Sequence, residues 1–226
     1  MKNRWEKLPA LLLAVAVFCG ILTASIGLPI YIRPFYYAHI EALDLPGVSG
    51  FTADQIRTAY DEVLDYLTLP GQEFGTGVMA CSDSAADHFR DCRVLFDLNA
   101  GVLLGSVTVI LVLLLLRRAG QIKSLRIGSR SGAFWGALAA VGLPLVIGAL
   151  AALDFSRAFV IFHSIFFPGK DNWIFDWYTD QIIRVLPQQF FMNCAILIGA
   201  GVLLLSLTVL AAERCFKKEN DYGHQA

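Results

Sequence analysis

Two histidines in this chain lie where an imidazole can transfer protons. His88 is followed at helical spacing by Asp91, and a carboxylate three residues further along a helix can orient an imidazole and raise its basicity. His163 lies in a phenylalanine-rich stretch that ends in a Pro-Gly turn and continues into an aromatic segment at 173–178. Because an imidazole titrates near neutral pH, it can accept a proton and later return it. The two residues therefore indicate acid–base chemistry.

Each feature also has an ordinary structural explanation. A single histidine such as His163 on an aromatic helix face is typical of packing, and His88 with Asp91 in an acidic region is typical of a solvated surface. The aromatic segment 173–178 is typical of a membrane–water interface, where tryptophan and tyrosine collect, and Asn172 fits a turn. A catalytic role is favoured because His88 and His163 lie in different polar regions, each close to a membrane span.

The composition is that of a membrane protein. Hydrophobic residues make up 56% of the 226 residues and charged residues 16%, whereas a soluble domain is nearer to about 25% charged. The net charge is −1 and no basic patch interleaved with aromatic residues occurs, so we expect no nucleic-acid partner. The five cysteines show no CxxC spacing, and the chain has neither a Walker A motif nor a GxSxG elbow. We therefore predict no cofactor and no metal.

Four uncharged stretches are long enough to cross a bilayer, since a helical span needs about 20 apolar residues. The first follows basic residues as a signal peptide does, but it is longer than the apolar core of a signal peptide, which has about 7–15 residues, so we expect an uncleaved anchor. Pro144 predicts a kink in the third stretch. The predicted segments are an N-terminus at 1–7, a span at 8–32, an outer loop at 33–97, a span at 98–116, a basic connection at 117–130, a span at 131–153, an outer loop at 154–187, a span at 188–212 and a tail at 213–226.

The basic residues fall in three clusters that agree on one orientation. Three Lys or Arg residues precede the first span, five lie in 117–130 and three lie in 213–226, whereas 33–97 carries four against eleven acidic residues. By the positive-inside rule both termini and the connection are cytoplasmic, and both large loops face outward. We predict an all-α membrane protein with four transmembrane helices and an extracytoplasmic cap built from the two outer loops. This setting permits a disulfide between Cys81 and Cys92, with two free thiols as the alternative.

Two helices are predicted inside the first outer loop. Residues 52–55 form a capping-box pattern, after which apolar residues recur at helical spacing until Pro70. Ser82 or Ser84 can cap a second helix that runs through His88 into the second span. A rise of 1.5 Å per residue then places His88 about 15 Å above the start of that span. The glycine-rich segment between the two helices is a loop or a short strand pair.

Three motifs flank the predicted spans. They are Asp87-His88-Phe-Arg-Asp91-Cys-Arg-Val-Leu-Phe96, then Phe162-His163-Ser-Ile-Phe166-Phe167-Pro168-Gly-Lys-Asp-Asn172-Trp173-Ile-Phe-Asp176, and finally Leu186-Pro187-Gln-Gln-Phe190-Phe191. With the outline of four spans, they resemble a bacterial integral membrane family that includes the lipoprotein intramolecular transacylase of Gram-positive bacteria. The resemblance extends over nearly the whole chain. The first motif departs from the family's pattern at Cys92, where the family has valine.

The resemblance implies an acyltransferase that acts within a diacylated lipoprotein. One acyl chain moves from the glycerol sn-2 oxygen to the α-amine of the N-terminal cysteine, and the matching catalytic positions are His88 and His163. An α-amine has a pKa of about 8, so one histidine can take its proton while the other protonates the departing glycerol oxygen. The candidate hydrogen-bond donors to the oxyanion are the Asn172 amide, the Trp173 ring N–H and Arg90. The candidate supporting residues are Asp91, Arg90, Asn172, Trp173 and Asp176.

Two other functions stay open on the sequence. The chain can be a non-enzymatic accessory or sensor protein that binds membrane lipid or a partner protein through its aromatic segment. It can also be a membrane metallohydrolase in which Asp91 or Asp176 completes a ligand set with the two histidines. We predict a multi-pass protein of the bacterial plasma membrane with its active site at the outer face, and a diacylated lipoprotein and membrane lipid as its partners. The oligomeric state and the division of roles between the histidines are left open.

Overall fold

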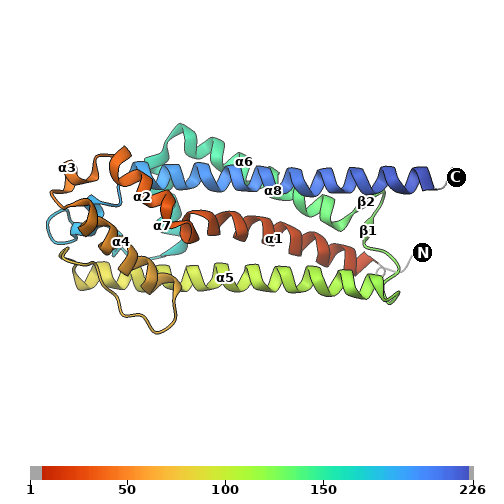
Figure 1. Ribbon diagram of the computed structural model, residues 1–226, viewed down its shortest axis with the longest axis horizontal. Helices are drawn as coiled ribbons and strands as arrows, with labels where there is room; N and C mark the ends of the chain where they lie inside the picture. The colour runs from red at the N-terminus through yellow and green to blue at the C-terminus, as the bar shows by residue number, and fades with distance from the viewer. Residues whose placement is uncertain (1–6, 224–226) are drawn as a thin grey trace. The chain divides into compact units, whose positions relative to one another are not determined.

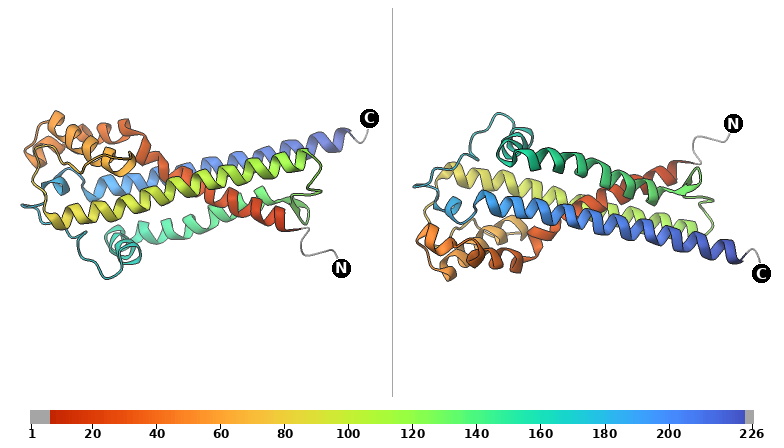
Figure 2. Two further views of the ribbon diagram at one scale, coloured as in Figure 1. Left: turned by 90° about the horizontal axis from the view of Figure 1, so that it is seen from below. Right: turned by 90° about the horizontal axis from the view of Figure 1, so that it is seen from above.

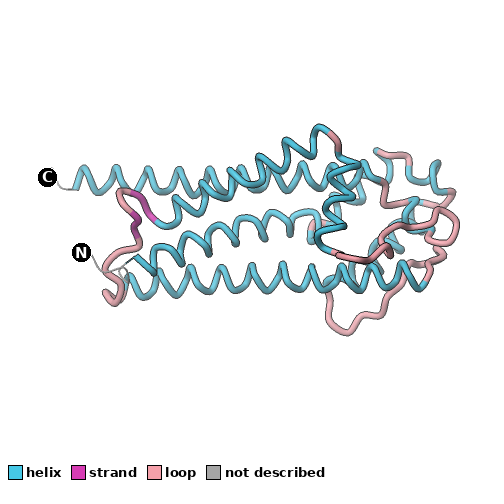
Figure 3. Tube along the Cα trace, turned by 180° about the vertical axis from the view of Figure 1, so that it is seen from behind, coloured by secondary structure: helices cyan, strands magenta, loops and turns pink. Residues whose placement is uncertain are grey.

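The computed structural model describes residues 7–223, with the side chains at 143, 145–147, 149–152 and 215–223 left out. The chain is mostly helical, with one short strand pair (Figures 1 and 3). The predicted N-terminal segment, up to residue 6, and the last three residues of the tail, including His224, lie outside the described residues. The elements are α1 (Leu8–Tyr31), α2 (Arg33–Ala42), α3 (Leu45–Ser49), α4 (Ala53–Thr68), α5 (Asp83–Arg118), β1 (Arg126–Ile127), β2 (Arg130–Ser131), α6 (Gly132–Leu153), α7 (Phe155–Phe166), the 3₁₀ helix η2 (Gln181–Arg184) and α8 (Gln188–Gly223).

Within the described residues, three helices are long and apolar enough to cross a membrane. They are α1, α5 and the part of α8 that ends at Arg214. In α6, the part before the first omitted side chain, Gly132–Gly142, counts as a shorter apolar helix. The prediction of a helical membrane protein is therefore confirmed. Beyond the predicted end of the span at residue 212, α8 continues as a helix to Gly223, through a stretch without an internal proline or glycine to break it.

One compact unit consists, within the described residues, of 7–27, 100–148 and 197–223. In it, α6 packs against α1 through glycines. A Cβ atom added to Gly132 or Gly136 would overlap the backbone carbonyl oxygen of Ala10 or Ala14 respectively. Small residues four apart on a helix allow this close backbone approach, which is common between helices in membranes.

The second unit, residues 28–99 and 149–196, contains His88 and His163, and we call it the histidine unit. Helices α2, α3 and α4 lie side by side in it, in every view of Figures 1 and 2. Tyr36 on α2 stacks on Tyr60 of α4, with ring centroids 3.6 Å apart and an interplanar angle of 6°. Both residues belong to the unit's hydrophobic core.

Helices α4 and α5 begin as the sequence predicts. Thr52 and Gln55 form the complete capping box of α4, and all five of the apolar positions expected on its buried face are buried. Ser82 caps α5, because its hydroxyl accepts a hydrogen bond from the Ala85 N–H at 3.1 Å. Helix α5 then runs without interruption to Arg118. The glycine-rich segment between the two helices is a loop. The buried positions of α4 are these five, Ile56, Tyr60, Val63, Leu64 and Leu67, together with Ala59.

Hydrogen bonds to the backbone join the two predicted outer loops within the histidine unit. The Tyr36 hydroxyl donates to the carbonyl oxygen of Val185 at 2.7 Å. The Ser82 N–H donates to the carboxylate of Asp180 at 2.9 Å, and that carboxylate belongs to a residue that is only 5% exposed. The N–H of Gln181 donates to the carbonyl oxygen of Ala80 at 2.9 Å. These contacts fix the segment that precedes α5 against the segment that precedes α8.

Candidate active site

The histidine unit brings His88 and His163 into contact. His88 lies near the start of α5 and His163 near the end of α7. Their ring centroids are 5.7 Å apart and their planes are inclined by 34°. Both residues are buried, with 7% and 6% of their surface exposed. Two residues from different predicted outer loops, each predicted from the sequence to carry protons, therefore form one buried pair.

His163 is oriented by its own helix and by an aromatic neighbour. Its Nδ1 atom lies 2.7 Å from the carbonyl oxygen of Phe159. Because a carbonyl oxygen only accepts, Nδ1 carries the proton and Nε2 of the neutral ring keeps its lone pair. The indole of Trp173 stacks on the imidazole at a centroid distance of 4.5 Å. Burial favours the neutral ring and lowers the pKa of His163, despite the opposing effect of the hydrogen bond to Phe159.

His88 has a more apolar environment. The rings of Phe167 and Phe175 meet its imidazole edge to face, with centroids 4.8 and 5.6 Å away. Its Nε2 atom lies 3.4 Å from the sulfur of Cys92, whereas its Nδ1 atom is buried and has no hydrogen-bond partner within the described residues. Burial, with the nearby charge of His163, lowers the pKa of His88 to about 4 against the opposing charge of Asp91. The ring is neutral at pH 7.

Asp91 anchors a loop and does not contact an imidazole. Its carboxylate accepts a hydrogen bond from the Lys170 ammonium at 2.6 Å and from the Asn172 amide at 3.0 Å. Burial acts to raise the pKa of Asp91, but these two bonds outweigh it and the pKa falls. Its hydrogen bonds go to Lys170 and Asn172 rather than to His88, although its charge acts to raise the pKa of His88 as expected for a nearby carboxylate. Asp91 holds the segment that places Trp173 on His163.

The three side chains considered as oxyanion donors are engaged elsewhere. The Asn172 amide donates to Asp91, and the Trp173 ring N–H donates to the carbonyl oxygen of Lys170 at 3.1 Å. Arg90 pairs with Asp87 on the exposed side of α5. Asn172 still has a free group, since its Oδ1 atom is buried and has no partner within the described residues. Because its NH₂ group faces a carboxylate, this free atom is the acceptor oxygen.

Asp176 stabilises a turn away from the imidazoles. Its carboxylate accepts from the backbone N–H groups of Tyr178 and Thr179 at 2.8 and 2.9 Å. These two bonds lower the pKa of Asp176. Nothing in these contacts links the residue to His88 or His163. Instead, its neighbour Phe175 contacts the ring of His88.

The cysteines of the histidine unit are free thiols. The disulfide that the sequence permits between Cys81 and Cys92 is absent, since the Cys81 thiol donates to the carbonyl oxygen of Ser82 at 3.7 Å and Cys92 meets His88. Within the described residues, no group of three or more His, Cys, Asp or Glu side chains is arranged to hold a metal ion. The pair of histidines thus has Cys92 and aromatic rings as its immediate neighbours.

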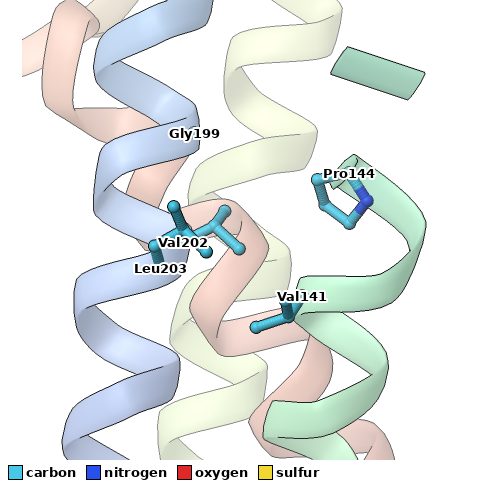
Figure 4. A pocket seen from close by; sticks show the side chains of 5 residues that line it. All are labelled: Val141, Pro144, Gly199, Val202 and Leu203. Atoms are coloured by element: carbon cyan, nitrogen blue, oxygen red, sulfur yellow. The ribbon is translucent and has the colours of Figure 1, made fainter. Parts of the chain in front are cut away.

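Sequence reasoning missed several parts of this site. Cys92 lies four residues after His88, so helical spacing alone was a usable signal. The Phe159 carbonyl oxygen that orients His163 is a backbone atom and leaves no signal in a single sequence. A separate apolar pocket in the other unit carries no titratable group and is distinct from the histidine pair (Figure 4). It is lined by Val141, Pro144, Gly199, Val202 and Leu203.

Comparisons with known proteins agree on one family. The sequence model of the family described as lipoprotein intramolecular transacylase Lit matches residues 11–191. The chain is similar to the crystallised membrane integral lipoprotein intramolecular transacylase Lit from Bacillus cereus, with a TM-score of 0.87, 22% identity, and coverage of 98% of this chain and 100% of that chain. Two variants of that protein each give a TM-score of 0.81 at 22% identity. The match to the variant with one histidine replaced by arginine covers 97% of this chain and 95% of that chain. The match to the variant with one histidine replaced by alanine covers 96% of each chain. None of the curated proteins compared with the chain matches it.

Proposed function

The chain belongs to the lipoprotein intramolecular transacylase family, and from this premise we propose that His163 and His88 are the catalytic residues of its reaction. The chain is a multi-pass membrane protein and a transferase that modifies lipoproteins. The observation that carries the proposal is the pair of buried, neutral imidazoles, whose ring centroids lie 5.7 Å apart. Buried titratable groups with shifted pKa values cluster at catalytic sites.

His163 is the base in this proposal. Its Nε2 lone pair takes a proton from the α-amine of the lipoprotein's N-terminal cysteine as the nitrogen attacks the ester carbonyl on the glycerol. A C–N bond forms, the C–O bond to the glycerol oxygen breaks, and one proton passes from nitrogen to the departing oxygen. Amine and ester belong to one molecule, so confining them lowers the barrier through proximity, and no covalent acyl-enzyme is needed. His88 is the second catalytic imidazole.

The remaining residues shape the site. Trp173 holds the plane of His163, and Asp91 holds Asn172 and Lys170 in place. The free Oδ1 atom of Asn172 can accept the second N–H of the attacking amine, which would orient the nitrogen lone pair toward the carbonyl carbon. We assign Arg90 to the surface and Asp176 to the turn that carries Phe175.

We further infer that α6 is a fourth span and that the histidine unit is an extracytoplasmic cap at the bacterial plasma membrane, with both termini cytoplasmic. The basic clusters and the close packing of α6 on α1 support this topology. A membrane-impermeant maleimide applied to intact cells should label Gln72→Cys and leave Gln121→Cys unlabelled. The reverse labelling pattern would refute the orientation.

The test of the catalytic proposal uses a diacylated lipopeptide with a free N-terminal cysteine amine. Acyl transfer leaves its mass unchanged and moves one acyl group onto nitrogen, which fragmentation in a mass spectrometer detects. We expect the isomer with the wild type and the His224→Ala control, and none with His88→Ala or His163→Ala. An untouched lipopeptide in the wild-type reaction would favour a binding protein, and loss of one acyl mass would favour a hydrolase.

A further inference from the structure

The thiol of Cys92 is the hydrogen-bond partner of His88. The two residues lie one turn apart on α5, and the sulfur is 3.4 Å from Nε2 of the imidazole. On the other side of the same ring, Nδ1 is buried and has no partner among the described residues, although only 7% of His88 is exposed. Burying a polar nitrogen without a partner is costly, and such an atom in an active site points to a group supplied by the substrate.

The chemistry of the two partners decides which of them donates. Burial, together with the charge of Asp91, raises the pKa of Cys92 to about 12, so the sulfur keeps its hydrogen at neutral pH. A neutral imidazole nitrogen is a good acceptor, whereas a thiol sulfur is a weak one. The favoured bond therefore runs from the S–H of Cys92 to Nε2 of His88. Since a neutral imidazole carries a single proton, that proton is then on Nδ1.

We propose that Cys92 is a positioning residue that holds neutral His88 with its proton on Nδ1, and that this N–H donates a hydrogen bond to the oxyanion formed during acyl transfer. This inference rests on the proposed catalytic role of the two histidines. It supplies a donor that does not depend on the Asn172 amide, the Trp173 ring N–H or Arg90, which form hydrogen bonds with other groups. His163 can then carry the single proton from the amine to the departing oxygen.

A neutral His88 is suited to this role. A neutral imidazole can stabilise developing negative charge through its N–H without losing its proton. The charged or titratable groups near the ring are the neutral thiol of Cys92 together with His163, Asp91 and Lys170, and the balance of burial and the charges of the last three leaves the ring neutral. The same pair of atoms could also form a thiolate and an imidazolium, as in cysteine nucleophiles. Burial disfavours both charged forms here, so Cys92 is not the nucleophile.

The first test separates donation by Cys92 from packing. Cys92→Ser keeps an X–H donor, whereas Cys92→Ala and Cys92→Val remove it. We expect Cys92→Ala and Cys92→Val to lower kcat by about ten-fold or more at an unchanged KM, since losing one oxyanion donor costs about 10²–10³, and Cys92→Ser to keep at least about half of the wild-type kcat. Cys81→Ala, which removes a thiol whose hydrogen bond goes to the backbone carbonyl of Ser82, should keep wild-type kinetics. Equal losses in Cys92→Ser and Cys92→Ala would overturn the proposal.

The second test reads the tautomer directly. Nitrogen-15 NMR of protein labelled at its histidines, assigned by comparison with His88→Ala, should show His88 neutral with its proton on Nδ1. In Cys92→Ala the proton should be shared with Nε2. A wild-type spectrum with the proton on Nε2 would overturn the proposal even if Cys92→Ala does not fold. If His88→Ala abolishes transfer while Cys92→Ala does not affect it, the role of Cys92 fails and the catalytic pair stands. If His88→Ala is fully active, the catalytic pair itself fails.

Discussion

The rings of His88 and His163 lie with centroids 5.7 Å apart, although they come from different predicted outer loops. Phe167 contacts both of them, and Trp173 stacks on His163. The result is a pair of imidazoles enclosed by aromatic rings that keep water away. In such surroundings a neutral ring is favoured and electrostatic interactions gain strength. A site of this kind can take a proton from an amine without competition from bulk water.

Replacing Asp91 with alanine should weaken catalysis more than stability. The change frees Lys170 and Asn172, and with them the segment that places Trp173 on His163. We expect kcat to fall about ten-fold or more, and hydrogen exchange to rise in residues 168–174. Lys170→Ala is the matched control, because an exposed ion pair contributes only about 0–1 kcal/mol. Equal losses of kcat in the two variants would show that the hydrogen bond from Asn172 to Asp91 is not needed to place Trp173 on His163.

Acidification should destabilise the fold between about pH 6.5 and pH 4. Burial lowers the pKa of His88 to about 4 and also lowers the pKa of His163, so the unfolded chain takes up protons first as the pH falls. The stability due to the neutral rings is fully present above about pH 6.5 and is lost toward pH 4. At about 1.4 kcal/mol per pKa unit, the lowered pKa of His88 contributes on the order of 3 kcal/mol to the change in the free energy of unfolding over this pH range. Thermal unfolding from pH 7.5 to 4.5 should show this slope, and His88→Gln should flatten it. An unchanged slope would contradict the shifted pKa.

Much of the fold could be predicted because local patterns encode it. The capping box at 52–55 and the apolar spacing after it predicted α4, and charge-free length predicted α1 and the apolar part of α5. The two histidines were recognisable from their residue type and their closeness to apolar stretches. These signals need no knowledge of distant contacts.

The rest depends on contacts between residues far apart in sequence. The carbonyl oxygen of Phe159 that orients His163 and the carbonyl oxygen of Val185 that accepts from Tyr36 are backbone atoms, which every residue has. Asp91 was expected to contact His88 because only helical spacing was visible. Its actual partners, Lys170 and Asn172, come from the other predicted outer loop. A single sequence does not show which of several partners a carboxylate selects.

Replacing Gly136 with alanine should destabilise the packing of α6 on α1. An added Cβ would overlap the carbonyl oxygen of Ala14 and lie 3.1 Å from the Cβ of Val17. Overpacking of this kind costs about 1–3 kcal/mol. Gly142→Ala in the same helix is the control, since its Cβ would meet nothing within 4 Å. Thermal unfolding in detergent should therefore show a lower Tm only for Gly136→Ala, and equal Tm values would contradict the close approach.

The most direct test of the catalytic pair is a double-mutant cycle on the acyl-transfer rate. Single-turnover kinetics would compare the wild type with His88→Ala, His163→Ala and the double variant on the same lipopeptide. We expect each single change to lower the rate by about 10²–10⁴. The double variant should then lose little more than the worse single variant, because residues that act in one step are not additive. Independent losses that multiply in the double variant, or a single variant with the wild-type rate, would contradict joint catalysis by His88 and His163.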